Sequence, residues 1–310
     1  MIQRIAIVGC GLIGSSWATW FSSKGLPTRM YDIDPEVCRR GAQWACDNLR
    51  TMVELEFFPP SELAAALSNV QPVATLDAVL MDCDYVQESV LEDYQTKAEV
   101  YRSLERHLSP NAIIASSSSG LLMTKMQQAL KHPERSLIAH PFNPPHLVPL
   151  VELVPGEFSS PETVAVVKAF FQQHGKRPVV LNKEVPGHIA NRLAAAVWRE
   201  ALALLDDDVA SLEDIDAALC TGPGMRWALM GQHLIYELGG GQQGYQGFFD
   251  GIGRSFSSYW QDMQTWTEIP ESVRVKAIAG TESLLKERTR DEWARWRDEK
   301  LVRLLQILED

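Results

Sequence analysis

The first part of the chain alternates short apolar runs with longer amphipathic runs. Residues 2–8 are almost continuously apolar, which is typical of a strand buried on both faces of a parallel sheet. Further apolar runs of strand length follow, mostly with helical periodicity between them. They cover residues 28–31, 73–75, 85–88, 112–116, 137–139, 148–154 and 178–181. This alternation predicts an α/β domain with a Rossmann-type doubly wound sheet.

Residues 35–67 have a helical pattern that is longer than a simple doubly wound domain needs. The consecutive prolines Pro59 and Pro60 break this stretch, and Ser61 is predicted as the N-cap of a second helix. We therefore expect a helical hairpin inserted after the second strand.

The strand pattern ends before residue 185. Residues 185–310 have only helical periodicity, with breaks at residues 222–224, 239–244 and 270. This change predicts two domains, a doubly wound domain over residues 1–184 and an all-α domain over residues 185–310.

A glycine-rich turn follows the first predicted strand. The sequence Gly9-Cys10-Gly11-Leu12-Ile13-Gly14 leads into an amphipathic run, as a dinucleotide-binding motif requires. The glycines permit a tight turn close to a pyrophosphate, and the helix that follows supplies N–H groups. Asp32 lies 18 residues past Gly14, where its carboxylate can accept both hydroxyls of an adenosine ribose. Ile33 follows instead of an arginine for a 2′-phosphate, so the motif favours NAD over NADP.

A proline-rich loop joins the apolar runs at residues 137–139 and 148–154. Its four prolines fix φ and make the connection stiff. His140 and Asn143 lie in this connection, and Glu152 follows on the next strand. A histidine with a carboxylate that orients it is the usual pair for moving a proton at neutral pH. The simpler alternative is a hydrogen-bonded histidine near a strand end, without a catalytic role.

Two further groups follow predicted strands at the carboxyl edge of the sheet. Glu92 and Lys97 come after the strand at residues 85–88, and Ser119 ends a run of serines after the strand at residues 112–116. An exposed helix pair and a solvated turn are the simpler explanations. Cofactors lie at this edge of doubly wound sheets, so a hydroxyl of the serine run facing a nicotinamide is the alternative.

The composition argues against several classes of function. The formal net charge of −11 leaves no basic stripe for a nucleic acid and disfavours an anionic membrane surface. No apolar run approaches the ~20 residues of a membrane span, and because the apolar pattern starts at Ile2 we expect no signal peptide. The five cysteines have no metal-ligand spacing, so we expect reduced thiols, no metal and a cytoplasmic protein.

Together these features resemble the 3-hydroxyacyl-CoA dehydrogenase superfamily over essentially the whole chain. The most diagnostic segment is Glu184-Val185-Pro186-Gly187-His188-Ile189-Ala190-Asn191-Arg192, at the start of the helical domain. The family usually has phenylalanine where His188 stands.

This resemblance implies a role for each matching residue. His140 would be the general acid/base, polarised by Glu152, while Ser119 and Asn191 would hydrogen-bond the reacting oxygen. The residues that would contact NAD are Gly9, Gly11, Leu12, Ile13, Gly14 and Asp32 at the adenosine and pyrophosphate half, and Glu92, Lys97 and Asn143 at the nicotinamide half.

Charge distinguishes the branches of this superfamily. Members that act on acyl-CoA carry lysines in the inserted hairpin, and the CoA phosphates need cations. This chain has no lysine or arginine from Thr51 to Thr96, so we expect a small free acid instead of a CoA ester. Residues 198–202 and 224–231 resemble the members that oxidise L-carnitine, ahead of those that oxidise L-gulonate and are similar to lambda-crystallin.

A quaternary ammonium is held by aromatic faces, each worth ~0.5–2 kcal/mol. The candidate walls are Trp198, Trp227, Tyr236 and Phe142, and Arg226 is the candidate partner of the substrate carboxylate. Packing between helices or subunits is the simpler explanation of each tryptophan.

The prediction is therefore an NAD-dependent dehydrogenase of a small L-3-hydroxy acid, L-carnitine first, that forms a homodimer. An L-gulonate 3-dehydrogenase or a 3-hydroxybutyryl-CoA dehydrogenase is the alternative. An NAD-binding structural protein of lambda-crystallin type is the non-enzymatic alternative, and the four intact catalytic candidates argue against it. Another alternative is an enzyme of the 3-hydroxyisobutyrate or 6-phosphogluconate type, which uses a lysine as acid/base. The helix that opens with Asn191-Arg192 has no lysine, which argues against this type.

Overall fold

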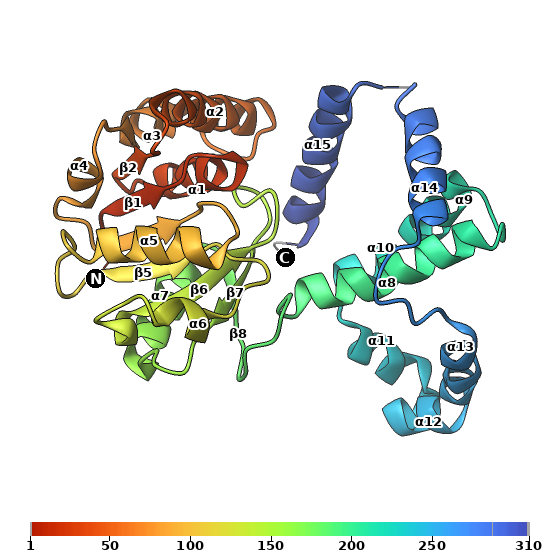
Figure 1. Ribbon diagram of the computed structural model, residues 1–310. Coiled ribbons are helices and arrows are strands. Elements are labelled where there is room, and N and C mark those ends of the chain that lie inside the picture. The colour runs from red at the N-terminus through yellow and green to blue at the C-terminus, as the bar shows by residue number, and fades with distance from the viewer. Residues whose placement is uncertain (1, 287, 309–310) are drawn as a thin grey trace. The chain divides into compact units, whose positions relative to one another are not determined.

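The computed structural model describes residues 2–286 and 288–308, and it divides into two compact units. The first unit comprises Met1–Arg192 and the second Leu193–Asp310 (Figure 1). The boundary predicted after residue 184 lies slightly before this division and stays a prediction.

The first unit is built on one eight-stranded sheet with the strand order β3-β2-β1-β4-β5-β6-β7-β8. The strands are β1 (Ile5–Val8), β2 (Thr28–Tyr31), β3 (Val70–Pro72), β4 (Tyr85–Glu88), β5 (Ile113–Ser116), β6 (Ser136–Pro141), β7 (Leu150–Val154) and β8 (Arg177–Val180). Neighbouring strands are parallel except β6 and β7, which are antiparallel. The order reverses between β1 and β4, which is where doubly wound sheets bind their ligands. The predicted fold class is confirmed.

Helices cover both faces of this sheet. They are α1 (Leu12–Ser23), α2 (Pro35–Glu54), α3 (Leu63–Asn69), α4 (Leu76–Leu80), α5 (Tyr94–Leu104), α6 (Met123–Gln127) and α7 (Pro161–Gln173). One apolar core joins α1, α2 and α7 to the sheet, and the second joins α4, α5 and α6 to its other face. Trp17 and Phe21 of α1 pack against Phe171 and Phe170 of α7, so large rings fill the first core.

Two local predictions in the inserted hairpin were wrong. The third strand covers Val70–Pro72 instead of residues 73–75, because α3 runs directly into it. Val70 and Val73 both fit an edge strand, and an apolar pattern alone does not fix which of them belongs to it. Ser61 is not an N-cap, because it lies inside a short 3₁₀ turn, Pro60–Glu62, that precedes α3.

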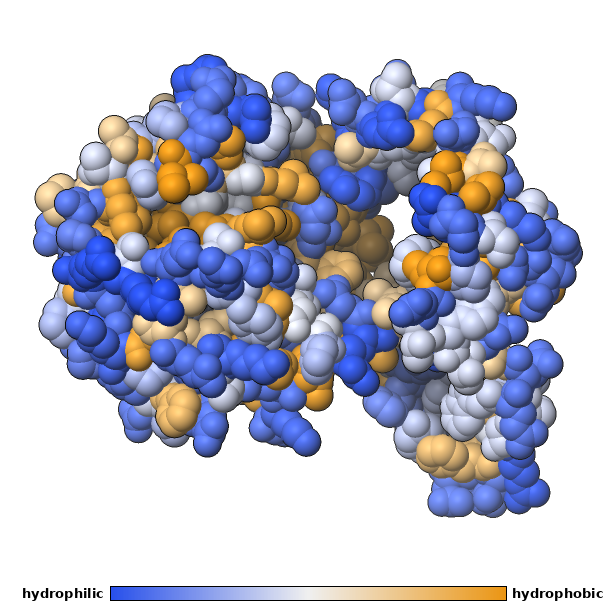
Figure 2. All heavy atoms as spheres, viewed as in Figure 1, coloured by the Kyte–Doolittle hydropathy of each residue, from blue (hydrophilic) through white to orange (hydrophobic). Residues whose placement is uncertain are grey.

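The described part of the second unit contains helices joined by turns and loops, with no strand, and α8 begins just before it. The helices are α8 (Ala190–Asp206), α9 (Leu212–Thr221), α10 (Pro223–Leu229), α11 (Gln232–Gly239), α12 (Gly244–Asp250), α13 (Phe256–Asp262), α14 (Glu271–Leu284) and α15 (Arg290–Leu308). The hydrophobic residues buried there are Leu202, Ala203, Ile235, Val273 and Val302. Many larger apolar side chains stay exposed, and Figure 2 shows several of them in orange. Among residues 2–286 and 288–308, no helix is both long and apolar enough to cross a membrane.

Candidate active site

The glycine-rich turn leaves β1 at the reversal point of the sheet. Gly9 has a φ of +94°, and a Cβ there would lie 2.6 Å from the carbonyl oxygen of Ser89. A Cβ on Gly14 would lie 1.9 Å from the backbone oxygen of Gly9, so both positions require glycine. Gly11 has open space around it and precedes α1, whose first N–H groups have no side-chain cap. The turn therefore has the open cradle of N–H groups that a pyrophosphate needs.

Asp32 lies beside this turn at the end of β2. Its Oδ2 accepts a hydrogen bond of 2.8 Å from the backbone N–H of Cys10, and its Oδ1 accepts one of 3.1 Å from Asp34. These bonds fix the carboxylate next to the glycine turn, where the ribose of a dinucleotide lies in this fold. The residues present fit the adenosine half of NAD.

The serine turn, residues 117–120 directly after β5, is hydrogen-bonded to Glu92. Oε1 of Glu92 accepts hydrogen bonds from the Ser118 hydroxyl at 2.7 Å and from the N–H groups of Ser119 at 2.8 Å and Gly120 at 3.0 Å. Burial raises the pKa of Glu92, but these bonds and the charge of Lys97, 3.5 Å from Oε2, outweigh it and lower the pKa below its usual value. The turn is therefore bound to a charged carboxylate and is not a freely solvated turn.

A buried ion pair lies next to the start of this turn. Nζ of Lys97 lies 2.7 Å from Oε1 of Glu88, the last residue of β4, and both side chains are fully buried. Glu88 also accepts hydrogen bonds from Ser116 at 2.7 Å and Tyr101 at 3.1 Å. Sequence reasoning missed Glu88, although a carboxylate ending a buried strand is the kind of residue that needs a partner.

His140 and Glu152 are opposite each other on the antiparallel strands β6 and β7. Nδ1 of His140 lies 2.8 Å from Oε2 of Glu152. Oε1 of Glu152 accepts hydrogen bonds from the N–H groups of Ile189 at 2.8 Å and Ala190 at 3.0 Å, at the start of α8. Burial raises the pKa of Glu152, but the bonds from His140 and from these two N–H groups outweigh it and lower the pKa.

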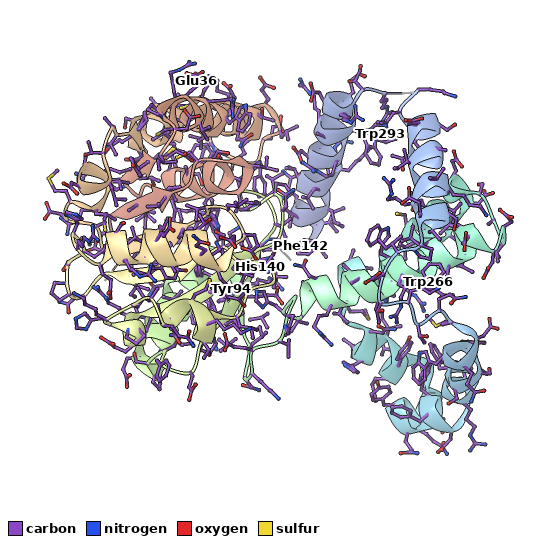
Figure 3. The ribbon with its side chains drawn as sticks, in the orientation of Figure 1. Glu36, Tyr94, His140, Phe142, Trp266 and Trp293 are labelled. Carbon is purple, nitrogen blue, oxygen red and sulfur yellow. The ribbon has the colours of Figure 1, made fainter. Side chains whose placement is uncertain are left out.

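A pocket of about 390 Å³ brings together three of the four predicted catalytic residues and the predicted nicotinamide residues. Its lining residues include Ile13, Glu92, Lys97, Ser119, His140, Phe142, Asn143 and Asn191. Nδ2 of Asn191 donates a hydrogen bond of 3.3 Å to the Ser119 carbonyl, so the serine turn and the start of α8 meet. His140 and Phe142 lie at the carboxyl end of β6 (Figure 3).

His188 is a second histidine in this region that sequence reasoning noted only as a family departure. It is 1% exposed, and its ring centroid lies 5.1 Å from that of His140. Three other histidines have hydrogen bonds away from this pair. His146 is bonded to Ser16 at 2.7 Å, His174 to the Phe170 carbonyl at 2.8 Å and His233 to Tyr245 at 2.9 Å.

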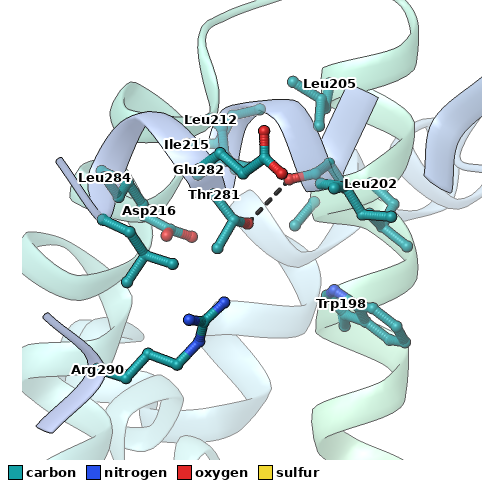
Figure 4. Close-up of a pocket in the computed structure, with 14 residues that line it drawn as sticks. Trp198, Leu202, Leu205, Leu212, Ile215, Asp216, Thr281, Glu282, Leu284 and Arg290 are labelled. Carbon is teal, nitrogen blue, oxygen red and sulfur yellow. Dashed lines mark hydrogen bonds between the residues drawn. The ribbon is translucent and has the colours of Figure 1, made fainter. Parts of the chain in front are cut away.

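The substrate candidates of the helical unit lie on three different helices. Trp198 of α8 lines a cavity of about 510 Å³ with apolar residues of α9 and α14, Asp216 and Arg290 (Figure 4). Tyr236 of α11 stacks on Phe248 at 4.1 Å. Arg226 and Trp227 are exposed on α10. Among the described residues, no ring contact joins Trp198, Trp227 and Tyr236, so the aromatic enclosure stays a prediction.

Comparisons with known proteins agree with this geometry. The family model of the 3-hydroxyacyl-CoA dehydrogenase NAD-binding domain matches residues 4–185, and that of its C-terminal domain matches residues 187–275. The L-carnitine dehydrogenase of Oceanobacillus iheyensis is 34% identical over 100% of this chain and 99% of its own length. The L-carnitine dehydrogenase of Bacillus cereus is 37% identical over 99% of this chain and 93% of its own length.

Solved structures of related enzymes have the same fold. One is the NAD⁺-dependent 5-formyl-3-hydroxy-2-methylpyridine 4-carboxylic acid 5-dehydrogenase, with a TM-score of 0.84, 30% identity and coverage of 100% of this chain and 99% of that one. Another is (S)-3-hydroxybutyryl-CoA dehydrogenase of Ralstonia eutropha, with a TM-score of 0.67, 26% identity and coverage of 93% and 95%. The predictions of an oxidoreductase and of NAD as its cofactor are confirmed. The chain belongs to the 3-hydroxyacyl-CoA dehydrogenase family.

Proposed function

We propose that this protein oxidises the 3-hydroxyl group of L-carnitine with NAD, using His140 as the general base. The observation that carries this proposal is the His140–Glu152 pair, whose histidine lines a pocket together with Ser119, Asn143 and Asn191. The substrate is inferred from the L-carnitine dehydrogenases that are 34–37% identical over the length of the chain.

The glycine turn, with Leu12 and Ile13, and Asp32 would hold the adenosine and pyrophosphate half of NAD. Glu92, Lys97 and Asn143 would lie at the nicotinamide half. When bound, NAD supplies the hydride acceptor for the oxidation. Oε1 of Glu92 is saturated by the serine turn, so Oε2 is the oxygen more available to a nicotinamide carboxamide.

The hydrogen bond to Glu152 leaves Nε2 of His140 as the nitrogen that can accept a proton. Its Nδ1 donates to Glu152, because a carboxylate only accepts, and this leaves the lone pair of the neutral ring on Nε2. Glu152 has a lowered pKa, so it stays charged and stabilises the imidazolium that forms when the hydroxyl proton reaches Nε2. Proton removal by a positioned histidine typically contributes about 10²–10⁴-fold to the rate.

Ser119 and Asn191 would orient the reacting oxygen. Nδ2 of Asn191 donates to the backbone oxygen of Ser119, so the Asn191 side chain is held against the serine turn where both residues line the pocket. Fixing the oxygen relative to His140 is an orientation effect, and such effects act on kcat. The absence of lysine and arginine from Thr51 to Thr96 supports a free acid over a CoA ester.

The direct test is NADH formation with L-carnitine, D-carnitine, L-gulonate, 3-hydroxybutyrate and 3-hydroxybutyryl-CoA. We expect turnover with L-carnitine. His140→Ala should lower kcat by at least about 10²-fold while NAD still binds. His132→Ala, which removes an exposed histidine, is the matched control and should keep full activity. Reaction with the CoA ester alone would contradict the substrate, and full activity of a folded His140→Ala variant would contradict the base.

A homodimer formed through the helical unit is part of this proposal. The few hydrophobic residues buried there and the many exposed ones support a second copy that covers this surface. Sedimentation should give a mass of two chains, and a stable monomer would contradict it. The five cysteines are all free, which supports the proposed cytoplasmic location.

A further inference from the structure

His188 lies in a backbone turn of unusual conformation. Gly187 has a φ of +77° and His188 a φ of +51°, so two consecutive residues are left-handed. A left-handed conformation is sterically unfavourable for a residue with a Cβ, and it persists only where the surroundings impose it. The next two N–H groups, of Ile189 and Ala190, both point to Oε1 of Glu152. The turn therefore directs its N–H groups at the carboxylate that holds His140.

The side chain of His188 connects this turn to the serine turn. Its Nε2 lies 3.0 Å from the backbone oxygen of Ser118. A carbonyl oxygen only accepts, so the hydrogen is on Nε2 and the neutral ring has its lone pair on Nδ1. Nδ1 is buried and has no hydrogen-bond partner among the described residues. Among the described residues, the His188 ring therefore makes a single hydrogen bond, from Nε2 to Ser118.

Ser118 is the central residue of the serine turn. Its hydroxyl donates to Glu92, and its neighbour Ser119 lines the pocket beside His140. His188 thus lies in the turn that binds Glu152, and its ring contacts both the serine turn and the His140 ring.

A phenylalanine at this position would fill the same space next to His140. It would not donate a hydrogen bond, and the Ser118 carbonyl would lose its side-chain donor. Packing alone therefore does not explain why a histidine stands here. A hydrogen bond that keeps Ser119 at a fixed distance from His140 does explain it.

We propose that His188 is a positioning residue for proton transfer, because its Nε2–H holds the serine turn at a fixed distance from the His140–Glu152 pair. This role rests on the proposed function. It acts through Ser119 and His140, and His188 itself does not contact the reacting atoms.

The test compares His188→Phe with His188→Gln. Phenylalanine keeps a ring and loses the donor, whereas glutamine loses the ring and keeps an N–H donor at a similar reach. We expect His188→Phe to lower kcat on the order of 10-fold with L-carnitine, the scale of one lost hydrogen bond in a desolvated site. His188→Gln should keep kcat within about 3-fold of the wild type. The KM for NAD should change little in either variant, because the glycine turn and Asp32 are not bonded to His188.

Two further readouts separate positioning from a loss of folded protein. Less folded protein lowers the apparent kcat but leaves the primary deuterium isotope effect and the pH dependence of kcat/KM unchanged. Misplacement of the oxygen slows hydride transfer, so the isotope effect should rise in His188→Phe. His174→Phe, the same substitution at a histidine packed on Trp20 and Phe170, is the control and should affect stability only.

Equal kinetics for wild type and His188→Phe would overturn the proposal, and so would a His188→Gln variant as impaired as His188→Phe. A wild type that oxidises no 3-hydroxy acid would remove the proposed function and this role with it. An active wild type without a difference between the two variants would remove only the role of His188.

Discussion

Lys176 has a buried amino group that forms no ion pair with a carboxylate among the described residues. Its Nζ donates hydrogen bonds to the carbonyls of Pro145 and Val148, in the loop that follows Asn143. It lies 5.1 Å from the ring centroid of Trp20. Burial, with a smaller contribution from the charge of Lys24, lowers the pKa of Lys176 from 10.5 to about 7.

The sign of the pH effect follows from this shift. Between pH 7 and 10.5 the unfolded chain keeps a proton on Lys176 that the folded chain has lost. The free energy of unfolding therefore rises with pH in this window. The two pKa values give a rise of about 2 kcal/mol between pH 7 and pH 9. Lys176→Met removes this contribution, so the stability of the variant relative to the wild type should fall by that amount over the same interval.

The measurement is urea unfolding of both proteins at pH 7, 8 and 9, at one protein concentration. Lys168→Met, which removes an exposed lysine of α7, controls for the loss of a positive charge. A stability difference between Lys176→Met and the wild type that stays constant over these pH values would refute the reasoning. It would mean that the ammonium is better solvated than its burial implies.

Three further predictions concern the cofactor site and the core. Asp32→Ser should raise the KM for NAD by about 10-fold or more in initial-rate measurements, because the ribose hydroxyls lose a charged acceptor. An unchanged KM would contradict the proposal that Asp32 binds the ribose. Lys97→Met should lower the free energy of unfolding in urea by about 3–5 kcal/mol, because the buried Glu88 side chain loses its cationic partner. A loss below ~1 kcal/mol would count against a charged pair. Gly14→Ala should fold poorly because its Cβ would lie 1.9 Å from a backbone oxygen, whereas Gly11→Ala should keep the wild-type thermal midpoint and weaken NAD binding.

Much of the fold and of the candidate site could be predicted from the sequence. The apolar runs located most strands, and the carboxyl ends of parallel strands meet at one edge of a sheet, so residues after them converge. This reasoning and the family resemblance singled out Glu92, Ser119 and His140, which the structure brings into one pocket.

The remaining features depend on tertiary contacts that a pattern does not contain. The left-handed turn at His188 and its bond to Ser118 join residues 70 positions apart. Lys176 is a charged residue near a strand start, and its burial follows from the packing of Trp17 and Trp20 above it. The register of β3 also depended on where α3 ended, which the sequence pattern did not determine.

The antiparallel register of β6 and β7 has a consequence for how this site can diversify. His140 and Glu152 are partners in a sheet ladder, so their spacing is set by the strands and not by the length of the loop between them. Insertions or deletions in that loop would leave the pair intact, whereas a slip of one residue in the ladder would turn Glu152 to the opposite face. The loop is therefore a place where homologues can vary in length, while the His140–Glu152 pair is inherited with the sheet.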